Sequence, residues 1–338
     1  MAFQPPIVLH HYVGSAYSQK ILWALAIKKL DWVSVEVPPI LPRPLLQPLT
    51  HGYRRIPILQ MGSDIFVDTA LILQELEKRF PEPSLFPKRK GSDKADRGLA
   101  QALSMWTDRY FWSATVALMP YGGSNDPPDA PKIYSQKALL QDRAALMGIK
   151  SFDLERIAAA RPVMLDKLRT NFEWIELQLS DGREWIFDTP YPSIADIHVG
   201  TNIWFLRNTK GAPEVARKDL YPNIYAWFAR LHAYAKANGK KPVKMTGEQA
   251  LEIAKKHKPM SHPATEDAND PNGRKIGDHV RIIPDDYGKI PVQGKIVSLG
   301  PLHIAIRPDG VSETGIDVVI WFPRVGYLVN PATPLVKL

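Results

Sequence analysis

Several hydroxyl-bearing side chains lie near the N-terminus, where an apolar run is followed by an expected helix. Tyr12 ends the apolar run, which predicts a strand, and Gly14 then lets the chain turn. Ser15 and Tyr17 stand where helical spacing begins. Backbone N–H groups at a helix N-terminus favour an anion. The pattern therefore predicts a place where hydroxyl groups and a helix start stabilise a negative charge.

Two further motifs follow in the same part of the chain. Arg55-Ile56-Pro57-Ile58-Leu59 puts a proline at the start of an expected strand. Holding an X–Pro bond in cis costs only about 0.5–1 kcal/mol, so proline suits such a bond. Val67-Asp68-Thr69 opens a second expected helix, where Asp68 is a good N-cap.

In their order and spacing, the three motifs resemble the thioredoxin-like N-terminal domain of the cytosolic glutathione transferases. The resemblance implies a domain that holds glutathione as co-substrate and ionises its thiol. The chain has no cysteine, which excludes disulfides, thiolate zinc sites and cysteine nucleophiles. The reacting thiol would therefore be that of glutathione. No metal site is expected, because His10 and His11 on a strand point to opposite faces.

Ser15 corresponds to the catalytic position of the serine- and cysteine-type transferases. Their motif runs roughly Ser/Cys-Pro-aromatic-Ser/Cys-x-Lys/Arg, and here Ala16 replaces the proline. Ser15 is thus expected to stabilise the thiolate, with a plain helix N-cap as the alternative. Tyr12 and Tyr17 are further candidates for this role, because tyrosine-type transferases use a phenol near the end of the first strand.

The resemblance also implies how the peptide of glutathione is held. Ile56 and Pro57 match the family's cis-proline, which lets the residue before it pair with the cysteinyl backbone like an added strand. Asp68 and Thr69 match the acidic and hydroxyl pair that holds the γ-glutamyl end. The alternative roles are a trans proline on an edge strand and a helix cap.

The glycyl carboxylate of glutathione needs a cation or a donor. In the family it often comes from the second helix, which a proline-rich segment replaces here. His51, Arg54 and Arg55 lie close in sequence to Pro57 and are the expected substitutes. The alternative for all three is solvated surface.

The second substrate is expected between the domains. Trp106 and Tyr110 lie on one face of the first long helix of the expected helical domain. In the family this helix lines the substrate pocket and the dimer interface, although an aromatic stripe equally suits a core. Arg109 would orient an acidic substrate or product.

Composition narrows the partners. The chain carries 43 Lys and Arg against 35 Asp and Glu, a formal net charge of +8. The lysines are spread out, so we expect a solvated basic face that suits a small anion, and no nucleic acid partner. No apolar run is long enough for a membrane span, and no signal peptide pattern opens the chain. We therefore expect a cytoplasmic protein, and the family resemblance implies a homodimer.

The expected fold class is α/β plus all-α with an appended β-unit. Residues 1–87 form the thioredoxin-like glutathione-binding domain, and residues 92–258 form the all-α domain of the transferase type. Ser193 and Asp196 have the spacing of a capping box in that domain, a structural feature that the family shares. Residues 274–338 alternate as in a small SH3-like β-barrel. This appendage resembles one in fungal transferase-like proteins.

Three functions are compatible with these features. The leading hypothesis is a transferase that adds glutathione thiolate to an electrophilic, apolar small molecule. The second is a glutathione-dependent isomerase or lyase, which needs the same thiolate. The third is a non-catalytic module that binds ligands or proteins, favoured by the replaced second helix and the extra barrel.

Overall fold

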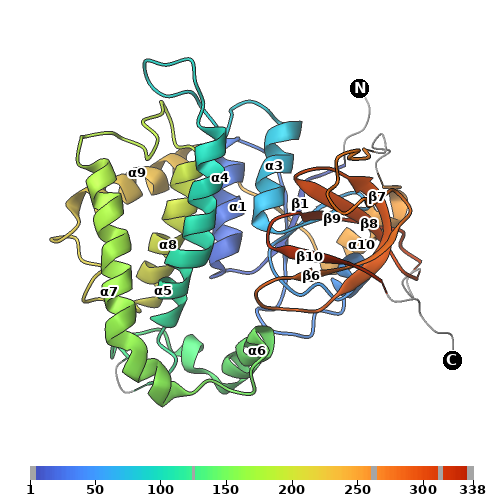
Figure 1. Cartoon of the computed structure of the whole chain (residues 1–338). Helices are drawn as coiled ribbons and strands as arrows, with labels where there is room; N and C mark the ends of the chain where they lie inside the picture. Colours follow the sequence, from blue (N-terminus) through green and yellow to red (C-terminus); the bar gives the residue numbers. More distant parts are fainter. Residues whose placement is uncertain (1–4, 124–125, 260–264, 311–314, 333–338) are drawn as a thin grey trace.

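The computed structural model describes residues 5–123, 126–259, 265–310 and 315–332. An α/β unit lies between a bundle of helices and a strand-rich C-terminal region (Figure 1). The N-terminal unit consists of β1 (Val8–His11), α1 (Ala16–Ile27), β2 (Val33–Glu36), α2 (Gln47–Thr50), β3 (Ile58–Met61), β4 (Asp64–Val67) and α3 (Thr69–Arg79).

The helical region begins with a long helix that is interrupted by a π-helical turn, η1. Its elements are α4 (Arg97–Met105), η1 (Trp106–Phe111), α5 (Trp112–Ala117), the 3-10 helix η2 (Lys132–Ser135), α6 (Lys137–Met147), α7 (Leu154–Leu179), α8 (Ile194–Thr209) and α9 (Pro222–Asn238). Among the described residues, no helix combines the length and the apolar character that crossing a membrane requires.

The chain then returns to the sheet and ends in strands. These last elements are β5 (Val243–Lys244), α10 (Gly247–Lys256), β6 (His279–Pro284), β7 (Val292–Leu299), β8 (His303–Pro308), β9 (Val319–Pro323) and β10 (Tyr327–Pro331). The expected strand-rich C-terminal region is confirmed. The three expected domain ranges stay a prediction.

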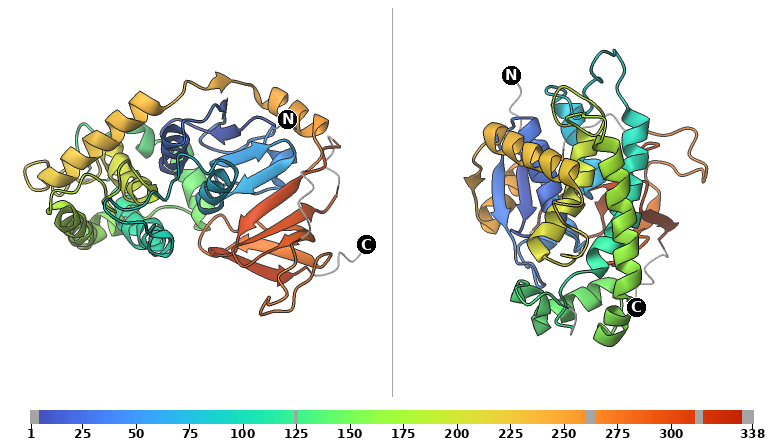
Figure 2. Two further views of the ribbon diagram at one scale, coloured as in Figure 1. Left: turned by 90° about the horizontal axis from the view of Figure 1, so that it is seen from above. Right: turned by 90° about the vertical axis from the view of Figure 1, so that its left-hand side faces the viewer.

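The ten strands of the described residues belong to one sheet. Its order is β10-β6-β7-β8-β9-β4-β3-β1-β2-β5, and Figure 2 shows the C-terminal strands continuing the N-terminal ones. The junction is a parallel pairing of β4 with β9, with Ile65 opposite Ile320 and Phe66 opposite Trp321. The Trp321 indole donates to the Asp64 carboxylate at 2.7 Å. The C-terminal strands are therefore an extension of the N-terminal sheet.

Side chains on β4 and β9 alternate between two cores. Phe66 and Trp321 stack 5.7 Å apart and join the first core, which α1, α3 and the helical region cover. Ile65 and Ile320 face the second core, which β3, α2, α10 and the C-terminal strands enclose. The helical region thus packs against one face of the sheet, and the second core lies on the other face.

Helix α10 was expected within the helical domain, but in the structure it packs on the N-terminal sheet. Ala250 contacts the apolar side chains of β1 and β2, and Leu251 and Ala254 enter the second core. Strand β5, just before it, pairs in parallel with β2. Residues 243–256 and the short α2 therefore cover the face of the N-terminal sheet that lies opposite α1 and α3.

The capping box at Ser193 is confirmed at the start of α8. The Asp196 carboxylate is fully buried and accepts hydrogen bonds from Ser193 N, Ile186 N and Trp227 Nε1 at 2.7–2.9 Å. Such a group stays stable in the interior because its acceptor atoms are satisfied. The box therefore fixes how α8 meets the preceding segment and α9.

His10 makes folding stability depend on pH. Its Nε2 lies 2.8 Å from Gln60 Oε1, and the Gln60 amide donates to Gly62 O and Ala250 O. Burial lowers the pKa of His10 from 6.5 to about 4, so the folded state holds the neutral ring and the unfolded chain binds the proton first. His10 therefore stabilises the fold fully above pH 6.5, and this contribution is lost as pH falls towards 4.

We expect the free energy of unfolding to drop by about 3 kcal/mol between pH 7 and pH 4 on account of His10. Urea unfolding of the protein and of His10→Gln at both pH values measures this. The variant should lose less stability on acidification than the parent. An equal loss in both proteins would assign the acid sensitivity to other groups.

Candidate functional site

Strand register brings the three N-terminal motifs to one end of the sheet. His10 lies opposite Ile58, and Ile58 lies opposite Val67. The turn after β1, the Ile56-Pro57 segment before β3 and the start of α3 after β4 are therefore neighbours. The region between these segments and η1 of the helical region, where Tyr17, Arg55 and Arg109 lie, is called the groove below.

Ser15 is the N-cap of α1 and is buried. Its Oγ accepts a hydrogen bond from Ser18 N at 3.2 Å. This bond uses a lone pair of the oxygen, so the hydroxyl proton can still be given to another acceptor. The N-cap role and the role of a donor to an anion are compatible in this geometry.

The two candidate phenols point to different surroundings. Tyr12 OH accepts from Arg143 of α6 at 3.2 Å, which turns this phenol towards α6. Tyr17 packs edge-on against Trp112 at 5.0 Å and lies close to Tyr287. Burial raises the pKa of Tyr17 well above its ordinary value. Tyr17 is therefore neutral at physiological pH and acts as a hydrogen-bonding group.

The peptide-binding candidates frame the rest of the groove. The Ile56–Pro57 bond is cis, and Pro57 is buried. Asp68 is the N-cap of α3, with Oδ1 accepting from Ala70 N at 3.0 Å. Its φ of +70° is rare for a residue with a side chain. Thr69 is buried in the first turn of α3.

The three candidates for the glycyl carboxylate have different neighbours, and Arg55 contacts Asp286 and Tyr287 of the segment after β6. His51 faces Asp309 at the end of β8, and burial lowers its pKa. Arg54 is paired with Asp142 of α6 at 2.9 Å. The structure thus separates these three neighbours in sequence.

Of the three residues expected at the second substrate, Arg109 faces the groove. Trp106 and Tyr110 share a face of η1, as expected, but both pack against Trp174 of α7, at 6.1 and 6.4 Å. Their role as substrate contacts stays a prediction.

A loop from the C-terminal strands contacts this groove, and no sequence motif predicted it. Residues 285–291, called the acidic loop below, connect β6 to β7. Asp286 forms an ion pair with Arg55, and Arg109 pairs with Asp285 at 2.7 Å. The Arg55 guanidinium also covers the Tyr287 ring, 4.3 Å from its centre.

A second contact with the C-terminal strands reaches Asp68. Tyr327 OH lies 2.7 Å from Tyr53 OH and donates to Asp68 Oδ2 at 3.3 Å. The acidic loop and Tyr327 are adjacent, because Tyr327 lies opposite Pro284 in the β6–β10 pairing. The first turn of α1, the segment before β3 and the start of α3 therefore all contact the C-terminal region.

An ion pair missed at the sequence level joins α1 to η1. Lys20 is fully buried, and its ammonium group donates to both carboxylate oxygens of Asp108 at 2.6 and 2.8 Å. Burial raises the pKa of Asp108, with the charge of Asp68 adding to this effect. A lysine within the apolar spacing of α1 was the one available signal.

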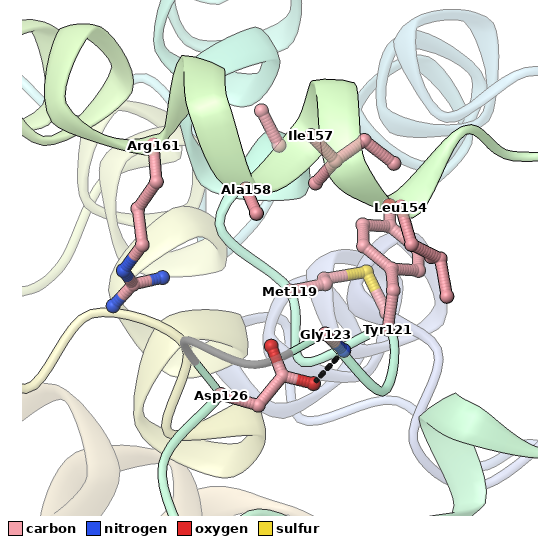
Figure 3. Close-up of a pocket in the computed structure, with 9 residues that line it drawn as sticks. Met119, Tyr121, Gly123, Asp126, Leu154, Ile157, Ala158 and Arg161 are labelled. Atoms are coloured by element: carbon pink, nitrogen blue, oxygen red, sulfur yellow. Dashed lines mark hydrogen bonds between the residues drawn. The ribbon is translucent and has the colours of Figure 1, made fainter.

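Two cavities lie outside the groove. The one in Figure 3, between residues 117–123 and Asp126 on one side and the start of α7 on the other, has a volume of about 20 Å³. It has room for a water molecule and not for a tripeptide. A larger one of about 160 Å³ lies beside α2, between Tyr53, Arg54 and Ile290. Neither contains Ser15 or Asp68.

Two family models match separate parts of this chain. A family model described as "Glutathione S-transferase, N-terminal domain" matches residues 9–84. One described as "Domain of unknown function (DUF7962)" matches residues 125–240. A tobacco (Nicotiana tabacum) protein named "Probable glutathione S-transferase" is 29% identical over 94 residues, which cover 28% of this chain and 40% of that protein. The match therefore spans less than half the length of this curated relative.

Solved structures extend the likeness to the C-terminal strands. A glutathione transferase-like protein from Pseudomonas syringae is 27% identical, with 97% of this chain and 99% of that chain covered at a TM-score of 0.70. Rice GST1, solved in complex with glutathione, shares the fold at 17% identity and a TM-score of 0.50, with 75% of this chain and 96% of that chain covered. Residues 9–84 thus match the N-terminal domain of the glutathione transferases, and the whole chain shares the fold of a transferase-like protein.

Proposed function

We propose that this protein binds glutathione in the groove at the sheet end and uses its thiolate to attack an electrophilic, apolar small molecule. The observation that carries the proposal is the shared location of Ser15, cis-Pro57 and Asp68, which the strand register imposes. The N-terminal family match and the glutathione complex of the rice structure support it.

Each residue has a role that its position allows. The Ser15 hydroxyl donates to the thiolate beside the N-terminus of α1. Ile56 offers its backbone to the cysteinyl part of the peptide, and Asp68 with Thr69 receives the γ-glutamyl end. Arg55 is the cation for the glycyl carboxylate.

The energies involved are sufficient without a catalytic base. A free thiol has a pKa of roughly 8.5, so making the thiolate dominant at neutral pH takes about 2.7 kcal/mol. A hydrogen bond to a charged group contributes roughly 1.5–3 kcal/mol, and a helix N-terminus adds about 0.3–1 kcal/mol. Ser15 and α1 together therefore supply the required stabilisation.

Replacing Ser15 by alanine is expected to raise the pKa of bound glutathione by about 1 to 2 and to lower turnover about 10- to 100-fold at neutral pH. Ultraviolet absorbance of the thiolate, titrated against pH, gives the pKa, and calorimetry gives the affinity. Ser18→Ala is the matched control, because it removes a hydroxyl one turn further along α1 and keeps the backbone N–H that bonds to Ser15. An unchanged thiolate pKa in Ser15→Ala would move the role to Tyr17, the phenol that lies in the groove.

The same thiolate serves isomerisation or elimination, in which glutathione leaves the product again. Product mass distinguishes these reactions, because conjugation retains the glutathione and the others do not. Acidic substrates are of interest in both cases, because Arg109 lies at the mouth of the groove.

A further inference from the structure

The acidic loop contacts α1, η1 and the segment before cis-Pro57 around the groove assigned to glutathione, while Tyr327 of β10 reaches Asp68 at the start of α3. Tyr287 meets Tyr17 on the first turn of α1 and stacks on Arg55 beside cis-Pro57. Asp285 and Asp286 meet Arg109 on η1, at 2.7 and 3.3 Å. The loop therefore lies where the proposed ligand would lie.

The chemistry of the loop resembles that of the ligand. Glutathione is an acidic peptide with two carboxylates, and the loop presents the carboxylates of Asp285 and Asp286 to two arginines. Arg55 holds the Asp286 carboxylate and also donates to the carbonyl of Tyr287. A guanidinium binds carboxylate and carbonyl oxygens through the same planar set of donors. Arg55 cannot serve the loop and a glycyl carboxylate fully at the same time.

The loop is attached to the rest of the protein mainly by polar contacts. Asp285 N donates to Gly326 O at its base, and Gly288 N donates to Leu146 O at the end of α6. Gly288 has a positive φ, and a side chain there would meet Leu146 and Arg55. The side chains of the Arg109–Asp285 pair are more than a third exposed, so this pair changes an affinity only a few-fold. The side chains of the Arg55–Asp286 pair are less exposed. An incoming ligand can replace these contacts.

We propose that the acidic loop is an intramolecular occupant of the glutathione groove, which glutathione must displace to bind. This inference rests on the proposed function. The apparent dissociation constant is then the intrinsic one divided by the fraction of molecules in which the loop is released. Contacts of the loop thereby set the glutathione affinity from outside the N-terminal domain.

Two pairs of variants test this by calorimetric titration with glutathione. Tyr287→Ala removes the stacking on Arg55 without a change of charge, and we expect it to bind about tenfold more tightly than the parent. Its control, Tyr225→Ala, removes a tyrosine that Arg207 covers at 5.3 Å, far from the groove on α9, and should leave the affinity unchanged. Asp285→Asn with Asp286→Asn should also tighten binding about tenfold.

The control for this double variant is Asp31→Asn with Asp317→Asn, which adds the same two positive units at exposed ion pairs with Lys240 and Arg307. Hydrogen exchange supplies a direct readout: in the parent, glutathione should speed exchange of the Gly288 amide that bonds to Leu146.

The outcomes separate the two proposals. Binding by the parent with no gain in Tyr287→Ala overturns the occupant role and leaves glutathione binding intact. A gain confined to the double aspartate variant also overturns it, because charge alone would then explain the effect. If Tyr287→Ala does not fold, slower exchange of Gly288 on adding glutathione overturns it. If neither the parent nor any folded loop variant binds glutathione, the proposed function itself fails.

Discussion

Removal of residues 274–338 is expected to leave a chain that does not fold cooperatively. The deletion strips the hydrogen-bonding partner from β4 and exposes the apolar side chains that β3, β4 and α2 send into the second core, among them Ile58, Ile65 and Val67. More than half of the buried residues in that core lie within residues 274–338. Each side chain returned to water costs about 1.5–3 kcal/mol, so the loss is about 10 kcal/mol. That equals the whole stability of an ordinary domain.

Thermal unfolding followed by circular dichroism, with size-exclusion chromatography, measures this effect. Deletion of residues 333–338 is the control, because it keeps all five C-terminal strands. A fragment 1–273 with a sigmoidal unfolding transition and a monodisperse elution peak would show instead that the N-terminal and helical regions are independent of the strands. Deletion of residues 274–338 would also leave β4 with one unpaired edge, so we expect the fragment 1–273 to aggregate.

Local patterns predicted most of the individual elements. The turn at Gly14, the cap at Asp68 and the capping box at Ser193 each depend on residues within one helical turn, and all three are present. Four of the five C-terminal strands were also visible as alternating stretches. The fifth, β10, ends in Asn330-Pro331 and follows β9 closely, so its signal was weak.

The junction of the two regions could not be predicted in the same way. Ile65 and Ile320 are paired across most of the chain. Both β4 and β9 are buried throughout, and they are apolar apart from Asp64 at the start of β4. Continuous apolar strands are typical of buried positions, but they carry no mark of which strand lies beside them. The register of β4 and β9 is set by the packing of their side chains into both cores.

The content of the groove escaped prediction for a related reason. Asp285-Asp286-Tyr287-Gly288 reads as an ordinary turn, and its place beside Arg55 follows from the β4–β9 junction. The family resemblance located the walls of the groove, because their motifs are local. It had no counterpart for a loop supplied by an appended region.

The buried pair of Lys20 and Asp108 is the second place where a large effect is expected. Lys20 has no exposed surface, and Asp108 is its ion-pair partner across the boundary between α1 and η1. Removing one member of such a pair leaves an uncompensated charge, at a cost of about 3–5 kcal/mol. We expect Lys20→Met to lose about 3 kcal/mol of unfolding free energy in urea, near the lower limit because the Asp108 side chain is 25% exposed.

The double variant Lys20→Met with Asp108→Leu should regain most of this loss, since it removes both charges and leaves an apolar contact. If the double variant is as unstable as the single one, the pair contributes through packing and not through charge. The position of the pair gives the result a functional meaning. Ser15 opens α1 and Arg109 follows Asp108, so this one contact holds the thiol end of the groove against the wall that carries the acidic loop. A stable double variant with weakened glutathione binding would show that the charges align these two walls as well as stabilise the fold.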